Sequence, residues 1–238
     1  MAVSIFIGAH SDIARATLNN MSGDQVFLLT RDASLLSDLT EQHTVMACDP
    51  CDLEQVNQCF STICASNQVD SVVNFCGSIL LKPAGMLNST EWNKTIAINL
   101  NTAFHVAHAT AKWIKKDCSV VFLSTAAASL GLPNHEAIAA AKAGVEGLSR
   151  SFAASYASQG IRSNVVAPGL IESKLSKSIV GSERGRNLSL SLHGLDRLGQ
   201  PNDVAQLIHW LIQPSNNWIT GEVFRVDGGL STIKSYPK

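Results

Sequence analysis

Short apolar runs alternate along the whole chain with longer segments of helical periodicity. The predicted strands are the runs rich in Val, Ile, Leu and Phe at residues 3–8, 25–30, 43–48, 70–76, 118–124, 161–167 and 222–226. Helical patterns fill residues 12–20, 33–39, 52–65, 89–115, 136–158 and 202–212. Continuously apolar strands separated by helices are typical of parallel sheets covered on both faces. The pattern therefore predicts an α/β fold, a Rossmann-like doubly wound sheet of about seven parallel strands with helices on both faces.

The chain is expected to form a single domain over residues 1–238. It contains no repeat, linker or low-complexity tract, and its 45% hydrophobic residues can supply one large core. A formal net charge of -1 and 6% aromatic residues argue against nucleic-acid binding. No apolar run approaches the ~20 residues of a membrane span, and the apolar start lacks the features of a signal peptide. We therefore expect a cytoplasmic protein with no membrane or nucleic-acid partner.

The six cysteines do not predict a metal site. Cys48 and Cys51 form one close pair, but Cys59 and Cys64 fall within a predicted helix, whereas a structural zinc site usually has a second close pair across a loop. Reduced thiols are the default in a chain without an export signal. We expect packed free thiols and no metal.

The residues that follow each strand matter most, because ligands of such sheets bind beyond the carboxyl ends of the strands. After the first strand, the sequence GAHSDIARA combines a small-residue turn with the start of a helix. Backbone N–H groups and the helix dipole at such a place can hold a diphosphate. The candidate residues are Gly8, His10, Ser11, Asp12 and Ile13. Taken alone, this segment is better interpreted as an ordinary tight turn, because Asp12 and Ala14 stand where a dinucleotide fingerprint prefers glycine.

The end of the second strand bears on the cofactor. An acidic residue here accepts a hydrogen bond from the ribose 2′-OH of NAD, whereas an arginine pairs with the 2′-phosphate of NADP. Thr30 carries no carboxylate and Arg31 is cationic, so the sequence favours NADP(H) over NAD(H). Asp32 beside them keeps NAD(H) as the alternative, and Arg31 has the further interpretation of a solvated loop residue.

Several downstream motifs follow in a specific order. They are CDP at residues 48–50, NFCG at residues 74–77, INL around Asn99, VVAPGLIES at residues 165–173, RLGQPNDVAQLIHWL, and ITGEVFRVDGG. In order and spacing they resemble the short-chain dehydrogenase/reductase family over nearly the whole chain. NFCG is similar to that family's NNAG segment with two residues altered, and INL places Asn99 at its catalytic asparagine.

The resemblance implies further cofactor contacts. Asp49 would meet the adenine, Lys142 would bind the nicotinamide ribose, and Ile171 and Ser173 would touch the carboxamide. The remaining residues on the matching motifs are Pro50, Asn74, Cys76, Gly77, Pro168 and Gly169. The resemblance also implies a small-molecule substrate and a homo-oligomer, either tetramer or dimer, with subunit contacts on the 89–115 and 136–158 helices.

The sequence NHEAIAAAKAG at residues 134–144 departs from the family pattern. The family's active helix carries YxxxK, with a serine thirteen residues before the tyrosine. Lys142 takes the lysine position and Thr125 the serine position, but Ile138 stands at the tyrosine position. The chain's two tyrosines are Tyr156 and Tyr236, both far along the sequence. The resemblance therefore implies an active site without its usual proton donor, and general acid–base help is typically worth about 10²–10⁴-fold in rate.

The proposed catalytic residues are Asn99, Thr125, Lys142 and His135. His135 lies three residues before Ile138, near the same helix face, and its free pKa of about 6.5 suits proton donation. A structural role is the competing interpretation. Glu136 is explained by the helix dipole alone. Ser124 is expected to face the other side of its strand.

Residues 172–197 are serine-rich and poorly periodic, so we predict a mobile flap over the site. The first functional hypothesis is an NADP(H)-dependent oxidoreductase for a small carbonyl or alcohol, with the proton supplied by Thr125, His135 or a water held by Lys142 and Asn99. The alternative is a catalytically silent NADP(H)-binding homologue with a regulatory or assembly role. A third hypothesis is a non-redox dehydratase or isomerase that uses His135 or Glu136 as base.

Overall fold

All seven predicted strands are present, and they form one parallel sheet. The computed structural model describes residues 2–234. Its strands are β1 (Val3–Ile7), β2 (Gln25–Thr30), β3 (Thr44–Ala47), β4 (Ser71–Asn74), β5 (Cys118–Leu123), β6 (Ile161–Pro168) and β7 (Val223–Val226). The strand order is β3-β2-β1-β4-β5-β6-β7, and each neighbouring pair is parallel. The order reverses between β1 and β4, which is where doubly wound sheets open a ligand crevice.

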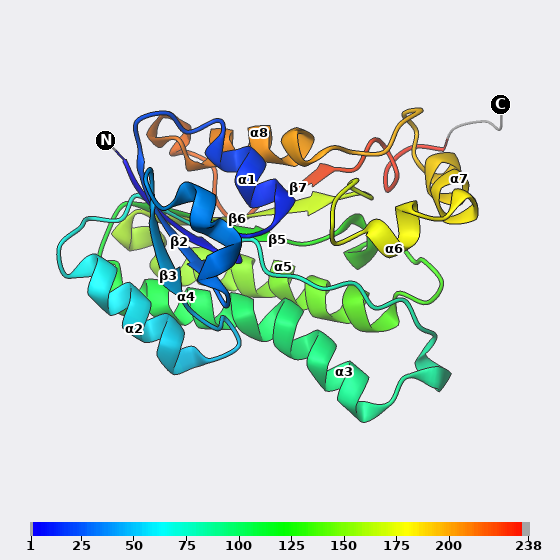
Figure 1. Ribbon diagram of the computed structural model, residues 1–238, viewed down its shortest axis with the longest axis horizontal. Helices are drawn as coiled ribbons and strands as arrows, with labels where there is room; N and C mark the ends of the chain where they lie inside the picture. The colour runs from blue at the N-terminus through cyan, green and yellow to red at the C-terminus, as the bar shows by residue number, and fades with distance from the viewer. Residues whose placement is uncertain (1, 235–238) are drawn as a thin grey trace.

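Helices cover both faces of the sheet (Figure 1). On one face α1 (Asp12–Leu18) packs against α8 (Pro201–Ile212). On the other lie α2 (Leu53–Cys64), α4 (Thr102–Trp113) and α5 (Glu136–Tyr156). The two faces have separate hydrophobic cores. The predicted α/β architecture is therefore confirmed.

Strand β5 shows why the apolar runs are continuous. All six of its residues are buried. Successive side chains alternate between the faces, so Val120 and Phe122 enter one core while Val121 and Leu123 enter the other. A strand buried on both sides has no solvent-facing positions left for polar residues, which removes the alternation that half-exposed strands show.

Two predicted helices differ in detail. The segment predicted as one helix over 89–115 consists of α3 (Ser89–Ile96), a π-helical turn at Ala97–Asn101 and α4. The segment at residues 33–39 is a 3-10 helix (Ala33–Leu39) with non-helical backbone at Leu36. Single π turns are frequent at functional sites, and this one carries Asn99. Shorter 3-10 helices lie at Ala84–Met86, Ala126–Ala128, Ala157–Gln159 and Pro214–Asn216.

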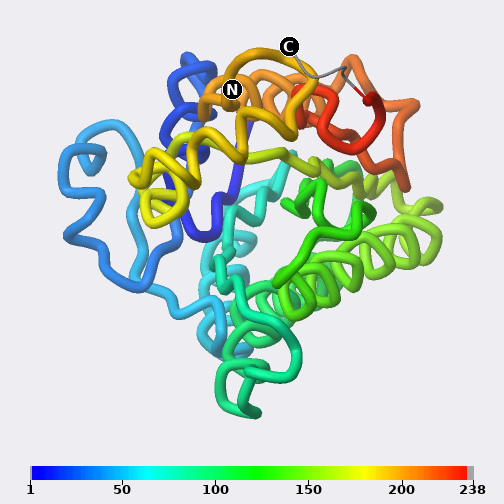
Figure 2. The backbone as a smooth tube through the Cα atoms, turned by 90° about the vertical axis from the view of Figure 1, so that its right-hand side faces the viewer, coloured from blue at the N-terminus to red at the C-terminus, as the bar shows by residue number. Residues whose placement is uncertain are grey.

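Residues 172–197 contain two helices that the sequence analysis did not predict. These are α6 (Lys177–Val180) and α7 (Glu183–Leu192), and neither buries a side chain. Figure 2 looks onto this end of the molecule, where the α6–α7 segment (yellow) lies beside the N-terminal strand and helix (blue). The mobility of this segment stays a prediction. Within residues 2–234, no helix is both long enough and apolar enough to cross a membrane.

Candidate functional site

A cavity of about 610 Å³ lies at the carboxyl ends of the strands. Its wall is made by residues that follow β1, β2, β4, β5 and β6, together with parts of α5 and the α6–α7 segment. All of the predicted catalytic and cofactor-binding residues except Asp49 and Asn74 line it. The topology thus brings together residues that are up to 165 positions apart, from Gly8 to Ser173.

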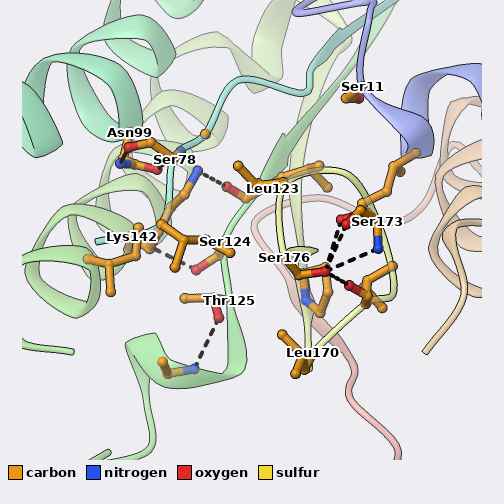
Figure 3. Close-up of a pocket in the computed structure, with 18 of the residues that line it drawn as sticks. Ser11, Ser78, Asn99, Leu123, Ser124, Thr125, Lys142, Leu170, Ser173 and Ser176 are labelled. Carbon is orange, nitrogen blue, oxygen red and sulfur yellow. Dashed lines mark hydrogen bonds between the residues drawn. The ribbon is translucent and has the colours of Figure 1, made fainter. Parts of the chain in front are cut away.

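Lys142 is buried in the wall of this cavity with 6% of its surface exposed. Its Nζ donates hydrogen bonds to the carbonyl oxygens of Leu123 (2.8 Å) and Cys76 (3.2 Å), and Figure 3 shows it pointing to the end of β5. Burial lowers the pKa of this amine to about 8. An ammonium group has three N–H donors, so two carbonyl partners leave one donor for a ligand.

Asn99 is held rigidly by the π turn. Its Nδ2 donates to the Ser78 hydroxyl (2.9 Å) and to the Thr95 carbonyl (3.0 Å), while its Oδ1 accepts from the Ser78 backbone N–H (3.0 Å). A Cβ added to Gly77 would lie 3.5 Å from this Oδ1 and 3.7 Å from the Lys142 Nζ. Gly77 therefore keeps the space beside both polar groups open. Sequence reasoning missed Ser78, which follows the NFCG motif directly.

The wall around Lys142 and Asn99 also contains Thr125, Ile138 and Ser124. Thr125 follows β5, and its Oγ1 accepts a long hydrogen bond (3.4 Å) from the Ala127 N–H, which leaves its O–H to donate. Ile138 is buried one helical turn before Lys142 and lines the same cavity. Ser124 was expected on the other side of the strand, but it too lines the cavity. Its hydroxyl donates to the Glu146 carboxylate at 2.7 Å.

His135 is partly exposed on the wall at the start of α5. Its Nδ1 lies 2.8 Å from the Pro133 carbonyl oxygen, so Nδ1 carries the proton of the neutral ring and Nε2 is the acceptor. Glu136, by contrast, accepts a hydrogen bond from the Ala84 N–H at 3.2 Å and is not part of the wall. The geometry separates the two candidates: His135 faces the cavity, whereas Glu136 ties α5 to a loop.

The turn after β1 forms the opposite end of the cavity. Gly8 has φ +72°, and a Cβ here would come within 3.1 Å of the Cys76 backbone N, so the turn requires glycine. Ser11 caps α1 by accepting from the Ala14 N–H. The Asp12 carboxylate accepts from the Lys174 backbone N–H at 2.6 Å. The start of α1 is thereby joined to the α6–α7 segment across the cavity edge.

Positive charge gathers at the end of β2. The buried Thr30 hydroxyl lies 3.1 Å from His10 Nδ1. Burial lowers the pKa of His10, and the nearby cations Arg31, Lys174 and Arg15 lower it further. Asp32 caps the following 3-10 helix by accepting from Ser34, and these hydrogen bonds lower the pKa of its carboxyl. Asp32 therefore already has a structural role.

Asp49 and Asn74 do not line the cavity, but each side chain supports a turn that is part of its wall. The Asp49 carboxylate accepts from the Cys51 N–H at 3.0 Å, and the Asn74 side chain accepts from the Cys76 N–H at 3.1 Å. Each side chain fixes the turn that presents a neighbouring residue to the cavity. Direct cofactor contacts of these two residues stay predictions.

The cavity has two unlike sides. We call Asn99, Ser124, Thr125 and Lys142 the inner side. The outer side consists of apolar residues of the α6–α7 segment, Leu175, Ile179, Leu188 and Leu192. Sequence reasoning missed the outer side, although the spacing of Leu188 and Leu192 places them one helical turn apart. In residues 2–234 all six cysteines are free, and no three His, Cys, Asp or Glu residues are grouped to hold a metal ion.

The outer side is anchored by a buried histidine. His193 Nδ1 lies 2.7 Å from the Ser189 carbonyl oxygen, and its Nε2 accepts from the Leu170 backbone N–H at 3.2 Å. A Cβ on Gly169 would come within 2.7 Å of that Nε2, which explains the glycine of the PG segment. The end of α7 is therefore bonded to the loop after β6.

Comparison with known proteins shows what the chain is similar to. The sequence model of a family described as enoyl-(acyl carrier protein) reductase matches residues 8–231. The chain belongs to the short-chain dehydrogenase/reductase family. The resemblance seen in the sequence is thus confirmed, and the chain is an oxidoreductase of the short-chain dehydrogenase/reductase type.

Relatives in this family cover nearly all of the chain. The 3-oxoacyl-[acyl-carrier-protein] reductase FabG of Thermotoga maritima is 27% identical over 96% of this chain and 97% of the relative. FabG of Salmonella typhimurium is 32% identical over 78% of this chain and 75% of the relative. The solved structure of ElxO with NADP bound has a TM-score of 0.88 at 27% identity, covering 96% of this chain and 98% of that one. The aldohexose dehydrogenase of Thermoplasma acidophilum also gives 0.88, at 26% identity over 100% and 97% of the two chains.

Proposed function

We propose that this short-chain dehydrogenase/reductase uses NADP(H) to interconvert a carbonyl compound and its alcohol, with a proton donor other than tyrosine. The observation that carries this proposal is the position of Lys142. A buried amine with one free N–H stands in a cavity beside Asn99 and Thr125. Together these groups can bind a ribose, orient a carbonyl oxygen and hold a proton.

The residues present fit a dinucleotide. Gly8 is open where a side chain would crowd the turn after β1. The start of α1 faces the cavity, and a helix N-terminus favours a diphosphate. The Asp12 carboxylate at that place is already partnered by Lys174, whose ammonium lies 3.8 Å away. When bound, the reduced nicotinamide supplies the hydride that the carbonyl carbon accepts.

The end of β2 supports NADP(H) over NAD(H). A carboxylate for the ribose 2′-OH would have to come from Asp32, but that group caps the following 3-10 helix. Arg31 is exposed on the cavity wall, whereas the nearby cations Arg15 and Lys174 are paired with Asp38 and Asp12. A 2′-phosphate fits this charge. The similar structures of ElxO have NADP bound, and NADPH in a Tyr→Phe variant.

The chain's own residues would bind the carbonyl oxygen of the substrate and supply the proton that it receives. The Thr125 hydroxyl donates a hydrogen bond to the carbonyl oxygen of the substrate. As negative charge develops on that oxygen, the proton comes from the Lys142 ammonium through a water beside Asn99. A donor works best when its pKa is close to the operating pH, and a pKa of about 8 meets that condition. Ile138 excludes water from the adjacent face without donating a proton. His135 is the second candidate donor, because its ring lies on the same wall and the doubly protonated ring carries a proton on Nε2 as well as on Nδ1.

The test is NADPH oxidation over a panel of aldehydes and ketones. We expect turnover in the wild type, a large loss in Lys142→Met, and a smaller loss in His135→Asn. Activity that persists in the double variant would contradict the proposed site. NADPH binding measured by fluorescence in the same samples distinguishes a lost cofactor from a lost proton donor.

Substitution of Ile138 separates the enzyme from a silent binding protein. Ile138→Tyr places a phenol beside Lys142 and should raise the rate by about 10–10²-fold if proton donation limits it. Ile138→Phe is the matched control, because it adds the ring without the hydroxyl. Tight NADPH binding by the wild type, with turnover only in Ile138→Tyr, would favour the catalytically silent alternative.

We also propose a homo-oligomer. Phe104 on α4 and Trp92 on α3 expose 48% and 40% of their surfaces, which is unusual for such large apolar side chains. Light scattering after size exclusion tests this, and a monomer at micromolar concentration would contradict it.

A further inference from the structure

Helix α7 has an apolar stripe that nothing in the described structure covers. Gly185, Leu188, Ser189 and Leu192 all line the cavity, at the spacing of a single helix face. Leu188 is 61% exposed and Leu192 is 44% exposed. Most helices of this length are stabilised by burying such a face against the rest of the protein. Here the face is turned toward the cavity.

Other elements direct apolar side chains to the same space. Leu81, which is 39% exposed, and Ile79 approach from the segment after β4, and Ile138 approaches from α5. Leu175, 54% exposed, joins them from the loop before α6. Exposed apolar residues that converge from separate elements on one cavity mark a ligand site.

Few charged groups lie on the wall of this cavity. The formally charged side chains on the wall are Asp12, Arg31, Lys142 and Lys174. Asp12 and Lys174 bind each other beside the start of α1, and Arg31 follows β2. A substrate with many hydroxyl groups would leave some of them unpaired against leucine, which would weaken its binding.

We propose that the outer side binds an unbranched aliphatic chain, so the substrate is a carbonyl compound with an alkyl tail and not a polyol. This inference rests on the proposed function, because Thr125 and Lys142 are taken to receive the carbonyl end. The tail then lies along Leu188 and Leu192. Each methylene that leaves water is worth ~0.8 kcal/mol, or about fourfold in affinity.

Such a tail has two chemical sources, a free ketone or aldehyde and an acyl thioester. Both present the same alkyl chain to α7. Methyl ketones from butanone to dodecanone represent the first source, and N-acetylcysteamine thioesters of 3-oxo acids represent the second. Binding is measured by displacement of Nile red in the presence of NADP⁺, so that no turnover is required.

The expected result is an affinity that rises about three- to fourfold per methylene until the cavity is filled. Leu188→Ser and Leu192→Ser should each weaken binding of the longer chains by about three- to tenfold. Leu35→Ser is the matched control, because Leu35 is 51% exposed and is not part of the cavity wall. It should leave binding unchanged. The source that binds more tightly at equal chain length identifies the natural class.

Three results would overturn the inference. They are affinity independent of chain length, equal effects of the Leu188 and Leu35 substitutions, and glucose binding as tightly as decanone. Failure of the proposed function has a different signature. If chain-length dependence is found without NADPH oxidation in any variant, the apolar site stands and the redox proposal fails. If polyols alone are turned over, the redox proposal stands and the apolar site fails.

Discussion

The inner and outer sides of the cavity are built in opposite ways. On the inner side Lys142, Asn99 and Ser124 are buried, and hydrogen bonds to neighbouring groups fix each of them. On the outer side Leu188 and Leu192 are exposed on α7, which buries none of its side chains, and Leu175 is exposed in the loop before α6. Polar side chains held by hydrogen bonds thus face the cavity on the side that would supply the proton. The other side offers contact area without fixed directions, which suits a ligand of variable length.

The largest expected difference between the two sides is in catalysis. Lys142→Met should lower kcat/KM by about 10²–10⁴-fold, because it removes the proposed proton source. Leu188→Ala should lower it by less than tenfold on a short substrate. Steady-state kinetics with a short ketone measures both. Comparable losses in the two variants would contradict the division of roles.

Stability should show the same contrast. Phe122 on β5 is fully buried, so Phe122→Ala should lower the free energy of unfolding by about 3–5 kcal/mol. Leu188→Ala should change it by less than about 0.5 kcal/mol, because the side chain is already exposed. Urea unfolding followed by circular dichroism gives both values. A loss of several kcal/mol in Leu188→Ala would mean that α7 is covered in solution, for instance by a second subunit.

A third comparison concerns Arg31, which follows β2 at the end of the cavity proposed to bind the cofactor. Removal of a charge-assisted contact typically costs about 1.5–3 kcal/mol. Arg31→Ala should therefore weaken NADPH binding by about 10–150-fold and leave NADH binding nearly unchanged. Fluorescence titration with both cofactors measures the ratio. Equal losses for the two would show that Arg31 does not contact a 2′-phosphate.

The pH dependence gives the smallest expected effect, about tenfold per pH unit. Burial lowers the pKa of Lys142 from its ordinary 10.5 to about 8, so the ammonium is lost above that pH and kcat/KM should fall. The contribution of Lys142 to the free energy of unfolding should change with pH in the opposite direction. Between about pH 8 and 10.5 the unfolded chain binds more protons than the folded one, so this residue's contribution to stability increases with pH.

A substitution on the outer side of the cavity serves as a control for the pH profile of kcat/KM. Leu188→Ser should keep the same inflection, because it leaves the surroundings of Lys142 intact. A profile without a limb near pH 8 in the wild type would remove Lys142 as the proton source. A larger loss of kcat/KM in His135→Asn than in Lys142→Met would assign that role to His135 instead.

The sequence was sufficient to predict the sheet and most of the cavity. Strands such as β5 are buried on both faces and therefore appear as uninterrupted apolar runs. Once the strands are placed, the residues that follow them, such as Gly8, Thr30 and Thr125, necessarily meet at one edge. The seven parallel strands and the family were confirmed, while the individual roles of the site residues stay predictions.

What the sequence did not reveal depends on contacts distant along the chain. The apolar spacing of Leu188 and Leu192 is hidden among serines, and the cavity that gives it meaning is formed by other elements. Asp49 and Asn74 carry side chains suited to a cofactor, but hydrogen bonds to Cys51 and Cys76 engage them in turns. Ser124 lines the cavity, but its hydroxyl donates to Glu146 on α5, which is not part of the wall.

The π turn at Ala97–Asn101 has a consequence for how this chain can change by insertion or deletion. A π turn contains one residue more than the α-helical path, so removing one residue between 97 and 101 would leave a continuous helix from α3 into α4. The fold should accept that deletion more readily than one inside α4. The candidate site should not accept a deletion that precedes Asn99, because the deletion would rotate the Asn99 side chain about 100° around the helix, away from Ser78. Deletion of one residue at this turn is therefore expected to preserve the fold while it disrupts the candidate site.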